Sequence, residues 1–246
     1  MDLTAARFPA DLALPLLDAV HARLGTVGLD RIERLLRDRA ADTRAVPYHP
    51  LQRTHLLHVP GLVAKPWHDP RDFAWTPAFE AAAATVHAEF KAVEAAGVAR
   101  DSWEDFGKGW WGWPIFQRGE WFADTLAHAP VTAALLRSIP HTQGEFLFSE
   151  LGAGGQIPLH AGGCNAVLSC HLALDIPPDC HIEVGGQQRT WQPGRVILFD
   201  DSFAHGCSNR SDQRRICLVW EVWHPGLTEV ERAAVALLYE RLFNAD

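Results

Sequence analysis

Two histidines stand beside turn residues in a pattern that could hold a metal ion. His160 lies in "IPLHAGGCN" and His205 in "DDSFAHGCSN", each at the expected end of a strand. They are 45 positions apart, room for about three strands, and in a small barrel this spacing can return the chain to the same mouth. A non-haem iron site typically adds a carboxylate as His-X-Asp or His-X-Glu, but Ala161 and Gly162 follow His160. The pair is therefore either no metal site or one that lacks its carboxylate.

Arg215 is a second residue that needs a chemical partner. It opens the segment "RICLVWEVW", ten residues after His205. Alternation along a strand puts Arg215 on the same face as Glu221, whereas the opposite face is wholly apolar. A guanidinium offers paired donors that suit a carboxylate. That carboxylate can belong to a ligand or to the protein, as a salt bridge to Glu221 or a nearby aspartate, and the sequence leaves both open.

The segments around these residues have the two-residue period of β-strands. In "NAVLSCHLALDIP", residues 165–177, one face is apolar and is expected in a core, while the other looks into a less apolar interior. The first face holds Leu168, Cys170, Leu172 and Leu174, and the second holds Val167, Ser169, His171 and Ala173. Further short strands in "CHIEVGG", "RVILFDD" and "RRICLVWEVW" indicate an all-β sandwich or barrel.

Helices are expected on both sides of this β region. Apolar residues recur at three- and four-residue spacing in residues 11–25, 29–41 and 78–97. Residues 45–75 form a Pro-rich connector, and "LTEVERAAVALLYERLF" returns to helix with Thr228 and Glu231 at capping-box spacing. We expect a single domain over residues 1–246, with a mainly helical region at 1–100, a β core at 101–225 and a C-terminal helix at 226–246.

Composition narrows the class of partner. The 246 residues are 48% hydrophobic and carry a formal net charge of −8, so a sizeable core is possible while a nucleic-acid or anionic-membrane surface is not favoured. The partner is expected to be a small molecule or a peptide. The first twenty residues lack the apolar run of a signal peptide or membrane span, which makes a cytoplasmic location the default expectation. Five cysteines, all in the second half and without a C-x-x-C pair, favour reduced thiols.

Several spaced motifs, in order, carry a family resemblance. The set "FLFSELGAGGQIPLHAGG", "LSCHLALDIP", "WQPGRVILFDDSFAHGCSN" and "RRICLVWEVWHPGL" resembles the aspartyl/asparaginyl β-hydroxylase family. The upstream "PGLVAKPWHDP" and "IFQRGEWFADTLAHAPVTAALLRSIP" also look like that family, so the resemblance spans roughly residues 55–227. It implies a double-stranded β-helix, a jelly roll of cupin type, as an all-β core with helical flanks.

The resemblance also implies a set of site residues. Members of this family are iron(II)- and 2-oxoglutarate-dependent oxygenases that keep two histidines and have Gly where related enzymes have Asp or Glu. His160 and His205 match the iron ligands, and Gly162 matches the vacant carboxylate position, which water can fill. Ser149 and Arg215 match positions that hold the distal carboxylate of 2-oxoglutarate. His171 matches a residue that contacts the carboxylate nearest the iron, and Ser169 lies on its strand face.

Two positions depart from the family pattern and bear on the substrate. The mammalian-type members usually have Arg at the positions of Val167 and Ser169. The first arginine binds an acidic group of the substrate, and the second assists in binding the co-substrate carboxylate. Both charges are absent here, so an aspartyl substrate does not follow. Trp113 belongs to a dense tryptophan cluster that forms either core or the wall of a pocket. Val167 and Trp113 are the candidate substrate contacts.

The expected function is that of a hydroxylase acting on an amino acid, free, carrier-bound or within a peptide. Its cofactors would be Fe(II), 2-oxoglutarate and O2, with release of succinate and CO2. An open iron position could instead accept halide, giving a halogenase, or the substrate radical could yield desaturation. A rival of another class is a non-catalytic, cupin-like module whose two histidines hold a metal without turnover. The substrate and the oligomeric state do not follow from the sequence.

Overall fold

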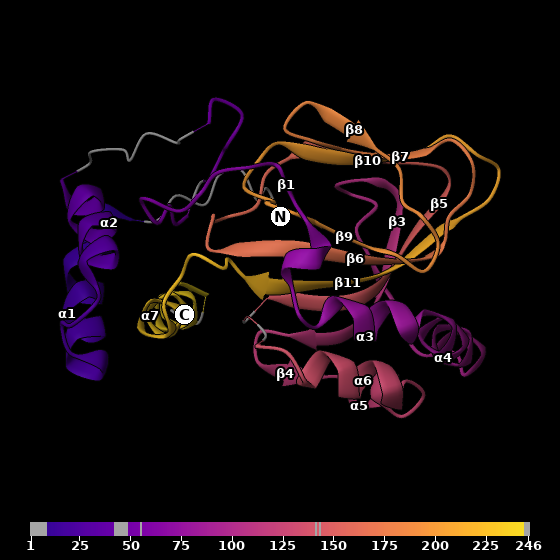
Figure 1. The fold of residues 1–246 in the computed structure, drawn as a ribbon, viewed down its shortest axis with the longest axis horizontal. Coiled ribbons are helices and arrows are strands. Elements are labelled where there is room, and N and C mark those ends of the chain that lie inside the picture. The colour runs from indigo at the N-terminus through magenta and orange to yellow at the C-terminus, as the bar shows by residue number, and fades with distance from the viewer. Residues whose placement is uncertain (1–8, 42–48, 55, 141, 143, 244–246) are drawn as a thin grey trace.

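The protein is described by a computed structural model over residues 9–41, 49–54, 56–140, 142 and 144–243 (Figure 1). The termini of the expected domain, and residues 45–48 and 55 of the expected connector, lie outside this range. The helices are η1 (Ala10–Leu12), α1 (Ala13–Leu24), α2 (Asp30–Ala40), η2 (Pro70–Asp72), α3 (Thr76–Ala81), α4 (Ala83–Ala95), α5 (Ala123–Leu126), α6 (Pro130–Arg137) and α7 (Glu229–Phe243). The strands are β1 (Trp67–His68), β2 (Asp101–Ser102), β3 (Lys108–Gln117), β4 (Glu120–Trp121), β5 (Glu145–His160), β6 (Val167–Asp175), β7 (Cys180–Val184), β8 (Gln187–Arg189), β9 (Val196–Phe199), β10 (His205–Asn209) and β11 (Arg215–Trp223).

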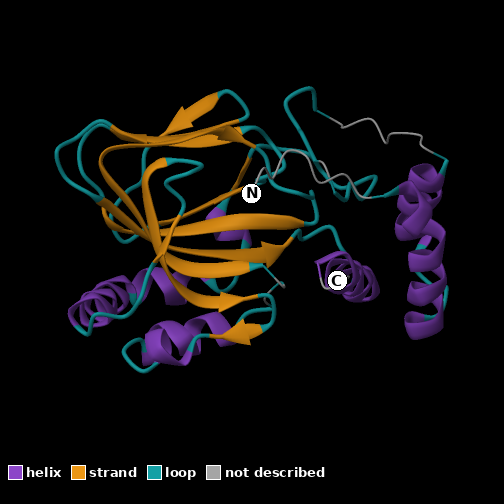
Figure 2. Ribbon diagram, turned by 180° about the vertical axis from the view of Figure 1, so that it is seen from behind, coloured by secondary structure: helices purple, strands orange, loops and turns teal. Residues whose placement is uncertain are grey.

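The strands form one antiparallel sheet that folds over on itself. Its order is β1-β9-β6-β11-β5-β10-β7-β8, with β3 also paired to β5. The first half of β5, at residues 147–151, pairs with β11, whereas its second half, at 156–160, pairs with β10. One layer is therefore β9-β6-β11-β5 and the other is β5-β10-β7-β8, and the two face each other (Figure 2). This is the double-stranded β-helix, and the expectation of an all-β jelly-roll core with helical flanks is confirmed.

The outer face of the first layer packs against helices. The face of β6 expected in a core, from Leu168 to Leu174, lies in one buried cluster with side chains of α3, α4 and α6. Phe79 of α3 stacks on Trp220 of β11 with ring centroids 4.6 Å apart. Figures 1 and 2 show these helices beneath the sheet. The other face of the same strands is thereby left for the interior of the barrel.

A second core joins the two ends of the chain. Buried side chains of α1 and α2 pack with those of α7, and Arg31 of α2 pairs with Glu231 of α7. The capping box at the start of α7 is confirmed, because Thr228 N donates to Glu231 Oε2 at 2.9 Å and Glu231 N donates to Thr228 Oγ1 at 3.3 Å. The helix expected at 78–97 is in fact two helices that meet at Ala82.

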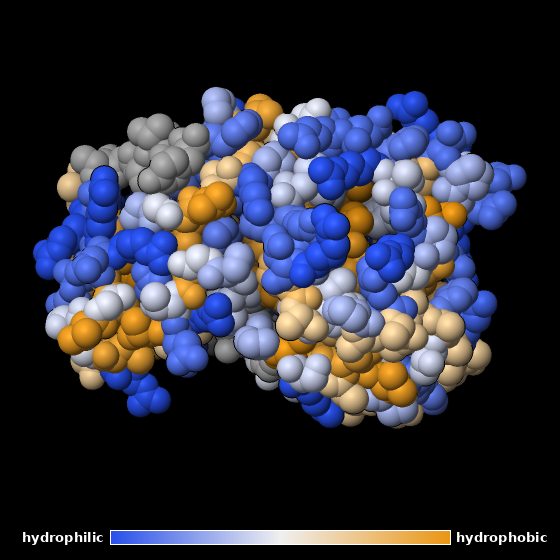
Figure 3. Space-filling model, in the orientation of Figure 1, coloured by the Kyte–Doolittle hydropathy of each residue, from blue (hydrophilic) through white to orange (hydrophobic). Residues whose placement is uncertain are grey.

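The surface of the protein is mixed in character. Apolar side chains gather at the lower edge of the face in Figure 3, over the helices, whereas the upper part is covered mainly by hydrophilic side chains. Within the described residues, no helix combines the length and the apolarity needed to cross a membrane.

The stacking of Phe79 on Trp220 tests the packing of the helices on the sheet. Both rings are fully buried, so we expect Phe79→Ala to lower the free energy of unfolding by about 3–5 kcal/mol, the usual cost of emptying an aromatic site in a core. Denaturant titration measures this value. Val63→Ala, at a position 67% exposed, is the control and should change stability by less than about 0.5 kcal/mol. Equal effects of the two substitutions would contradict the packing described here.

Candidate active site

The two histidines singled out in the sequence lie directly opposite each other. His160 ends β5 and His205 begins β10, and the two are partners in the antiparallel register. Their ring centroids are 4.1 Å apart. The Nδ1 atom of each ring lies 2.9 Å from a backbone carbonyl two residues earlier, Pro158 O for His160 and Phe203 O for His205. A carbonyl can only accept, so each Nδ1 carries the proton and each Nε2 keeps a free lone pair.

Burial keeps both imidazoles neutral. It lowers the pKa of His160, and it lowers the pKa of His205 to about 3 with a further contribution from His160. Neutral rings with a free Nε2 and a carbonyl on Nδ1 are what a metal-binding histidine pair requires. Among the described residues, no group of three or more His, Cys, Asp and Glu side chains is placed to hold a metal ion. Two imidazoles are thus the protein donors that the described site offers.

Gly162 is fixed by the side chain of Asp201. A Cβ at Gly162 would lie 2.4 Å from Asp201 Oδ2 and 2.5 Å from Asp201 Cγ, far closer than real contacts. The Gly162 N–H also donates to the backbone oxygen of Asp201 at 2.7 Å. An Asp or Glu side chain at position 162 would therefore collide with the carboxylate of Asp201. Asp201 Oδ1 is buried without a hydrogen-bond partner among the described residues, and burial raises the pKa of Asp201 well above its usual value.

Asp200 organises the turn that leads to His205. It is buried and accepts hydrogen bonds from the Ser202 backbone N–H at 3.0 Å, from the Ser202 hydroxyl, and from Gln52 Nε2 at 3.4 Å. No lysine or arginine forms an ion pair with it in the described part of the chain. Burial accordingly raises the pKa of Asp200 to about 7.

Arg215 lies deep in the barrel without a carboxylate. It is 1% exposed, and its Nη1 donates to Ser149 Oγ at 3.2 Å and to Ser149 O at 3.3 Å. Its Nε is buried and has no partner among the described residues. The guanidinium stacks 5.3 Å from the ring centre of Trp191. The salt bridge to Glu221 or a nearby aspartate, which the sequence left open, is absent from the described structure, so Arg215 remains available to a ligand carboxylate.

His171 is held in one tautomer by Trp191. The indole Nε1–H donates to His171 Nδ1 at 3.2 Å, and the two rings are parallel within 5°. Since Nδ1 accepts, the proton of the neutral ring is on Nε2, and burial together with Arg215 lowers the pKa of His171 well below its usual value. His171 can therefore donate one hydrogen bond from Nε2.

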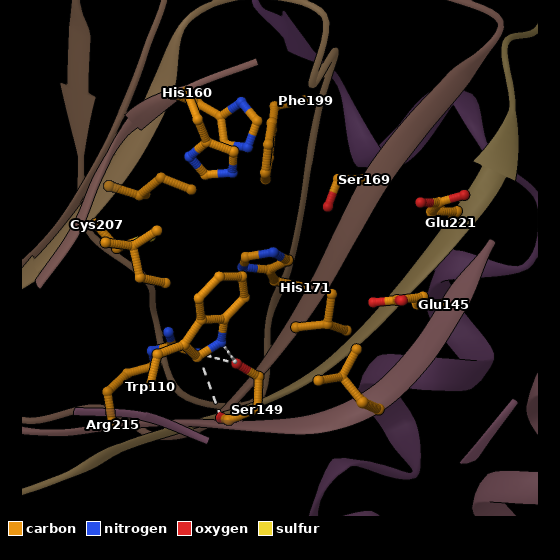
Figure 4. Close-up of a pocket in the computed structure, with 15 residues that line it drawn as sticks. Trp110, Glu145, Ser149, His160, Ser169, His171, Phe199, Cys207, Arg215 and Glu221 are labelled. Atoms are coloured by element: carbon orange, nitrogen blue, oxygen red, sulfur yellow. Dashed lines mark hydrogen bonds between the residues drawn. The ribbon is translucent and has the colours of Figure 1, made fainter. Parts of the chain in front are cut away.

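These residues share one cavity inside the barrel (Figure 4). In Figure 4 His160, whose ring is next to that of His205, lies at one side, Arg215 with Ser149 at the bottom, and Ser169 with Glu145 and Glu221 at the far side. The structure thus brings together six of the residues assigned from the sequence. They are Ser149, His160, Ser169, His171, His205 and Arg215.

Two residues assigned to the substrate from the sequence do not line this cavity. Trp113 is buried on the outer face of β3, where its ring lies against Phe90 and its indole N–H donates to Val98 O at 3.2 Å. Strand alternation explains this position, because Trp110 faces the cavity and Trp113 is an odd number of residues away. Val167 is two positions from Ser169 and therefore on the same face of β6. It begins the strand, however, and packs in the helical core at the end of the barrel. These positions give neither residue a place at the cavity wall.

Sequence reasoning missed two residues that shape the site and left open whether a third, Trp110 of the tryptophan cluster, lies in the core or in a pocket wall. Asp201 excludes a side chain at Gly162, Trp191 orients His171, and Trp110 donates to Ser149 Oγ at 3.3 Å. The pair of adjacent aspartates before His205 was a usable signal for Asp201, because a buried strand end seldom carries two acids without a role. The contacts of the two tryptophans join distant segments and left no local pattern.

Comparison with known proteins agrees with the motifs. The family described as aspartyl/asparaginyl beta-hydroxylase matches residues 80–225. The chain belongs to this family. Human aspartyl/asparaginyl beta-hydroxylase is 31% identical over 199 residues, which cover 73% of this chain and 25% of that protein. Mouse aspartate beta-hydroxylase domain-containing protein 1 is 27% identical over 246 residues, which cover 91% of this chain and 66% of that protein.

Both relatives are longer than this member of the β-hydroxylase family. The chain spans a quarter of the length of the human relative and 66% of the mouse relative. Among solved structures, a cupin-like protein from Thermotoga maritima overlaps 56% of this chain and 92% of its own, at 14% identity and a TM-score of 0.34. That overlap is too low to bear on function, and the fold rests on the strand pairing given above.

Asp200 makes the stability of the protein depend on pH in a defined direction. Its pKa is about 7 when folded against an ordinary value of 3.8, so the folded state holds a proton that the unfolded state loses first. Stability contributed by this group is present below about pH 4 and is lost as the pH rises through 7, by at most about 4 kcal/mol. We expect Asp200→Asn to remove this decrease in unfolding free energy between about pH 4 and pH 7. Unfolding free energies at about pH 5 and about pH 8 measure it.

The comparison needs a control with the same change of charge. Asp212 is exposed, and Asp212→Asn should leave the pH dependence of the unfolding free energy as in the unsubstituted protein. Parallel pH profiles for Asp200→Asn and the unsubstituted protein would show that Asp200 is not a buried, protonated acid.

Proposed function

We propose that this protein is an Fe(II)- and 2-oxoglutarate-dependent dioxygenase that hydroxylates an amino acid, free, carrier-bound or within a peptide, with release of succinate and CO2. One observation carries the proposal. A neutral histidine pair with free Nε2 atoms shares one cavity with a buried arginine that has no carboxylate partner among the described residues. Membership in a hydroxylase family supports it.

The donor set suits Fe(II) with room for further ligands. His160 and His205 would hold the ion through Nε2, since each Nδ1 is already bonded to a carbonyl. Asp201 would stand beside the position that Gly162 leaves without a carboxylate, where its unpartnered Oδ1 could accept a hydrogen bond from a bound water. When bound, iron would supply the activation of O2 against the co-substrate.

The deep end of the cavity suits a dicarboxylate. Arg215 and Ser149 together present guanidinium and hydroxyl donors, and burial makes a charge-assisted bond there strong. His171 would donate from Nε2 to the second carboxylate nearer the histidine pair, because Trp191 occupies its Nδ1. Ser169, two residues away on the same strand face, also lines the cavity. The chain therefore offers donors to both ends of 2-oxoglutarate.

Apolar side chains complete the walls and limit water. Ile157, Ile182 and Phe199 line the cavity around the histidine pair, and Phe199 lies 5.3 Å from the His205 ring. Such walls hold a substrate carbon close to the reacting centre and lower the local dielectric, which strengthens the polar contacts of Arg215. The protein thus contributes orientation and exclusion of solvent.

Two measurements separate this proposal from its rivals. Succinate formed from 2-oxoglutarate under Fe(II) and O2 distinguishes an enzyme from a cupin-like module that only holds a metal. The product mass then separates hydroxylation, which adds one oxygen, from desaturation, which removes two hydrogens, and from halogenation, which adds a halogen. Absence of succinate in the presence of iron, oxygen and a broad amino-acid and peptide panel would contradict the proposal.

The first prediction concerns the histidine pair. We expect His160→Ala and His205→Ala each to abolish turnover and to weaken Fe(II) binding sharply, because two imidazoles leave no spare protein donor. Succinate assays and metal titration by calorimetry measure both effects. His128→Ala, at an exposed position after α5, is the control and should keep both properties. Substantial activity in either cavity variant would overturn the assignment.

The second prediction concerns Arg215. Loss of one partner of a desolvated charge pair costs about 2–5 kcal/mol, so Arg215→Ala should raise the 2-oxoglutarate requirement by tens-fold or more. The KM for 2-oxoglutarate and its direct binding to the metal-loaded protein measure this. Arg210→Ala removes an exposed arginine and should leave the KM unchanged. If Arg215→Ala unfolds while its folded fraction binds 2-oxoglutarate normally, Arg215 has only a structural role.

A further inference from the structure

The end of the cavity away from Arg215 is acidic. Glu145 of β5 and Glu221 of β11 both line it, and Figure 4 shows their carboxylates beside Ser169 on the side away from Arg215. Arg215 and Glu221 lie on one face of β11, and their Cα atoms are six residues or about 20 Å apart at 3.3 Å per residue. A five-carbon dicarboxylate is shorter than this separation, so one held by Arg215 would leave space toward Glu221. The acidic end is therefore left for the substrate.

The protein supplies hydrogen bonds but no cation to these carboxylates. Thr142 Oγ1 donates to Glu221 Oε2 at 3.0 Å, and Gln117 Nε2 donates to Glu145 Oε1 at 2.6 Å. The residue across the strand pair from Glu221 is the neutral Ser169. Within the described residues, neither glutamate forms an ion pair with a lysine or arginine, and Arg215 is the one cation among the side chains that line the cavity.

Glu221 is half-buried and has no cation partner among the described residues. The backbone of Gly144 lies directly against its carboxylate, since a Cβ there would be 1.8 Å from Glu221 Oε2. Burial raises the pKa of Glu221, and the charge of Glu221 in turn raises the pKa of Asp201. A half-buried carboxylate beside a second, exposed one at Glu145, with no counter-charge among the described residues, is disfavoured by their mutual repulsion. A cation bound at this end would relieve that repulsion.

We propose that Glu221, assisted by Glu145, makes this cavity selective for a substrate that carries a cationic group, an ammonium or a guanidinium. N–H donors of such a group would bond to the glutamate carboxylates, a charge-assisted contact of the stronger kind. A substrate carboxylate is repelled from the same place. This inference rests on the proposed hydroxylase function and adds the substrate class to it.

The test uses four amino-acid amides that differ chiefly in charge and in its position. Norleucine amide carries an α-ammonium, Nα-acetyl-lysine amide carries a side-chain ammonium, Nα-acetyl-norleucine amide is neutral, and Nα-acetyl-glutamate amide is acidic. Their binding is measured by calorimetry on the protein loaded with Zn(II) and 2-oxoglutarate, which needs no turnover. Succinate formation and added product mass are measured separately with Fe(II) and O2.

We expect at least one cationic probe to bind about tenfold or more tightly than the neutral probe, and the acidic probe to bind most weakly. Which cationic probe is preferred tells whether the group is the α-ammonium or a basic side chain. Equal binding of the neutral and cationic probes, or preference for the acidic probe, would overturn the proposal.

Variants assign the effect to the glutamates. Glu221→Gln keeps the shape of the side chain and its bond from Thr142, so it should fold, keep 2-oxoglutarate binding and lose most of the cationic preference. Glu145→Gln should lose a smaller part. Glu183→Gln, on β7 and outside the cavity lining, is the control with the same charge change. An unchanged preference in Glu221→Gln would contradict the proposed role.

The two proposals fail in different ways. If cationic probes bind selectively but no succinate forms, the hydroxylase function is wrong and the acidic end of the cavity is retained as a binding site. If succinate forms without a charge preference in binding, the hydroxylase function stands and the role of Glu221 is wrong.

Discussion

The register between β5 and β10 is the constraint on which the cavity depends. It sets His205 opposite His160, and a slip of one residue would turn one imidazole to the other face. Gly206 makes the close approach possible, because a Cβ there would lie 2.7 Å from Ile157 O, and the register shifts between His205 and Cys207. β5 reaches this place because its sixteen residues serve both layers of the barrel. The histidine pair is thus a consequence of strand pairing.

Local periodicity predicted much of the fold. The alternation in β6 correctly separated the face that packs on the helices from the face that carries Ser169 and His171. The Thr228 and Glu231 spacing correctly located the start of α7. The break at Ala82 could not be predicted, because Ala-rich sequence has helical propensity throughout and the break depends on how α3 and α4 pack on the sheet.

The site residues that stand at strand ends could be predicted from the sequence. Those that contribute through contacts between distant segments could not. Arg215, His160 and His205 stand at strand ends that the turn residues mark. Strand alternation predicts which face a residue is on but not how far along the strand the cavity extends. Val167 shares a face with Ser169 yet lies beyond the cavity in the helical core. Trp191 reaches His171 from a distant segment, and no period in the sequence records such a contact.

The interior of this barrel carries opposite charges that do not meet. Arg215 and Glu221 lie on the same face of β11, with the apolar Val219 and the neutral thiol of Cys217 between them. Each charge would be stabilised by the other if they were adjacent, so their separation costs stability. A fold keeps such an arrangement at low cost only if ligands supply the missing partners, since binding to the native state stabilises it. The separation of charge along β11 therefore favours an interior shaped for two ligands, an anion at Arg215 and a cation at Glu221.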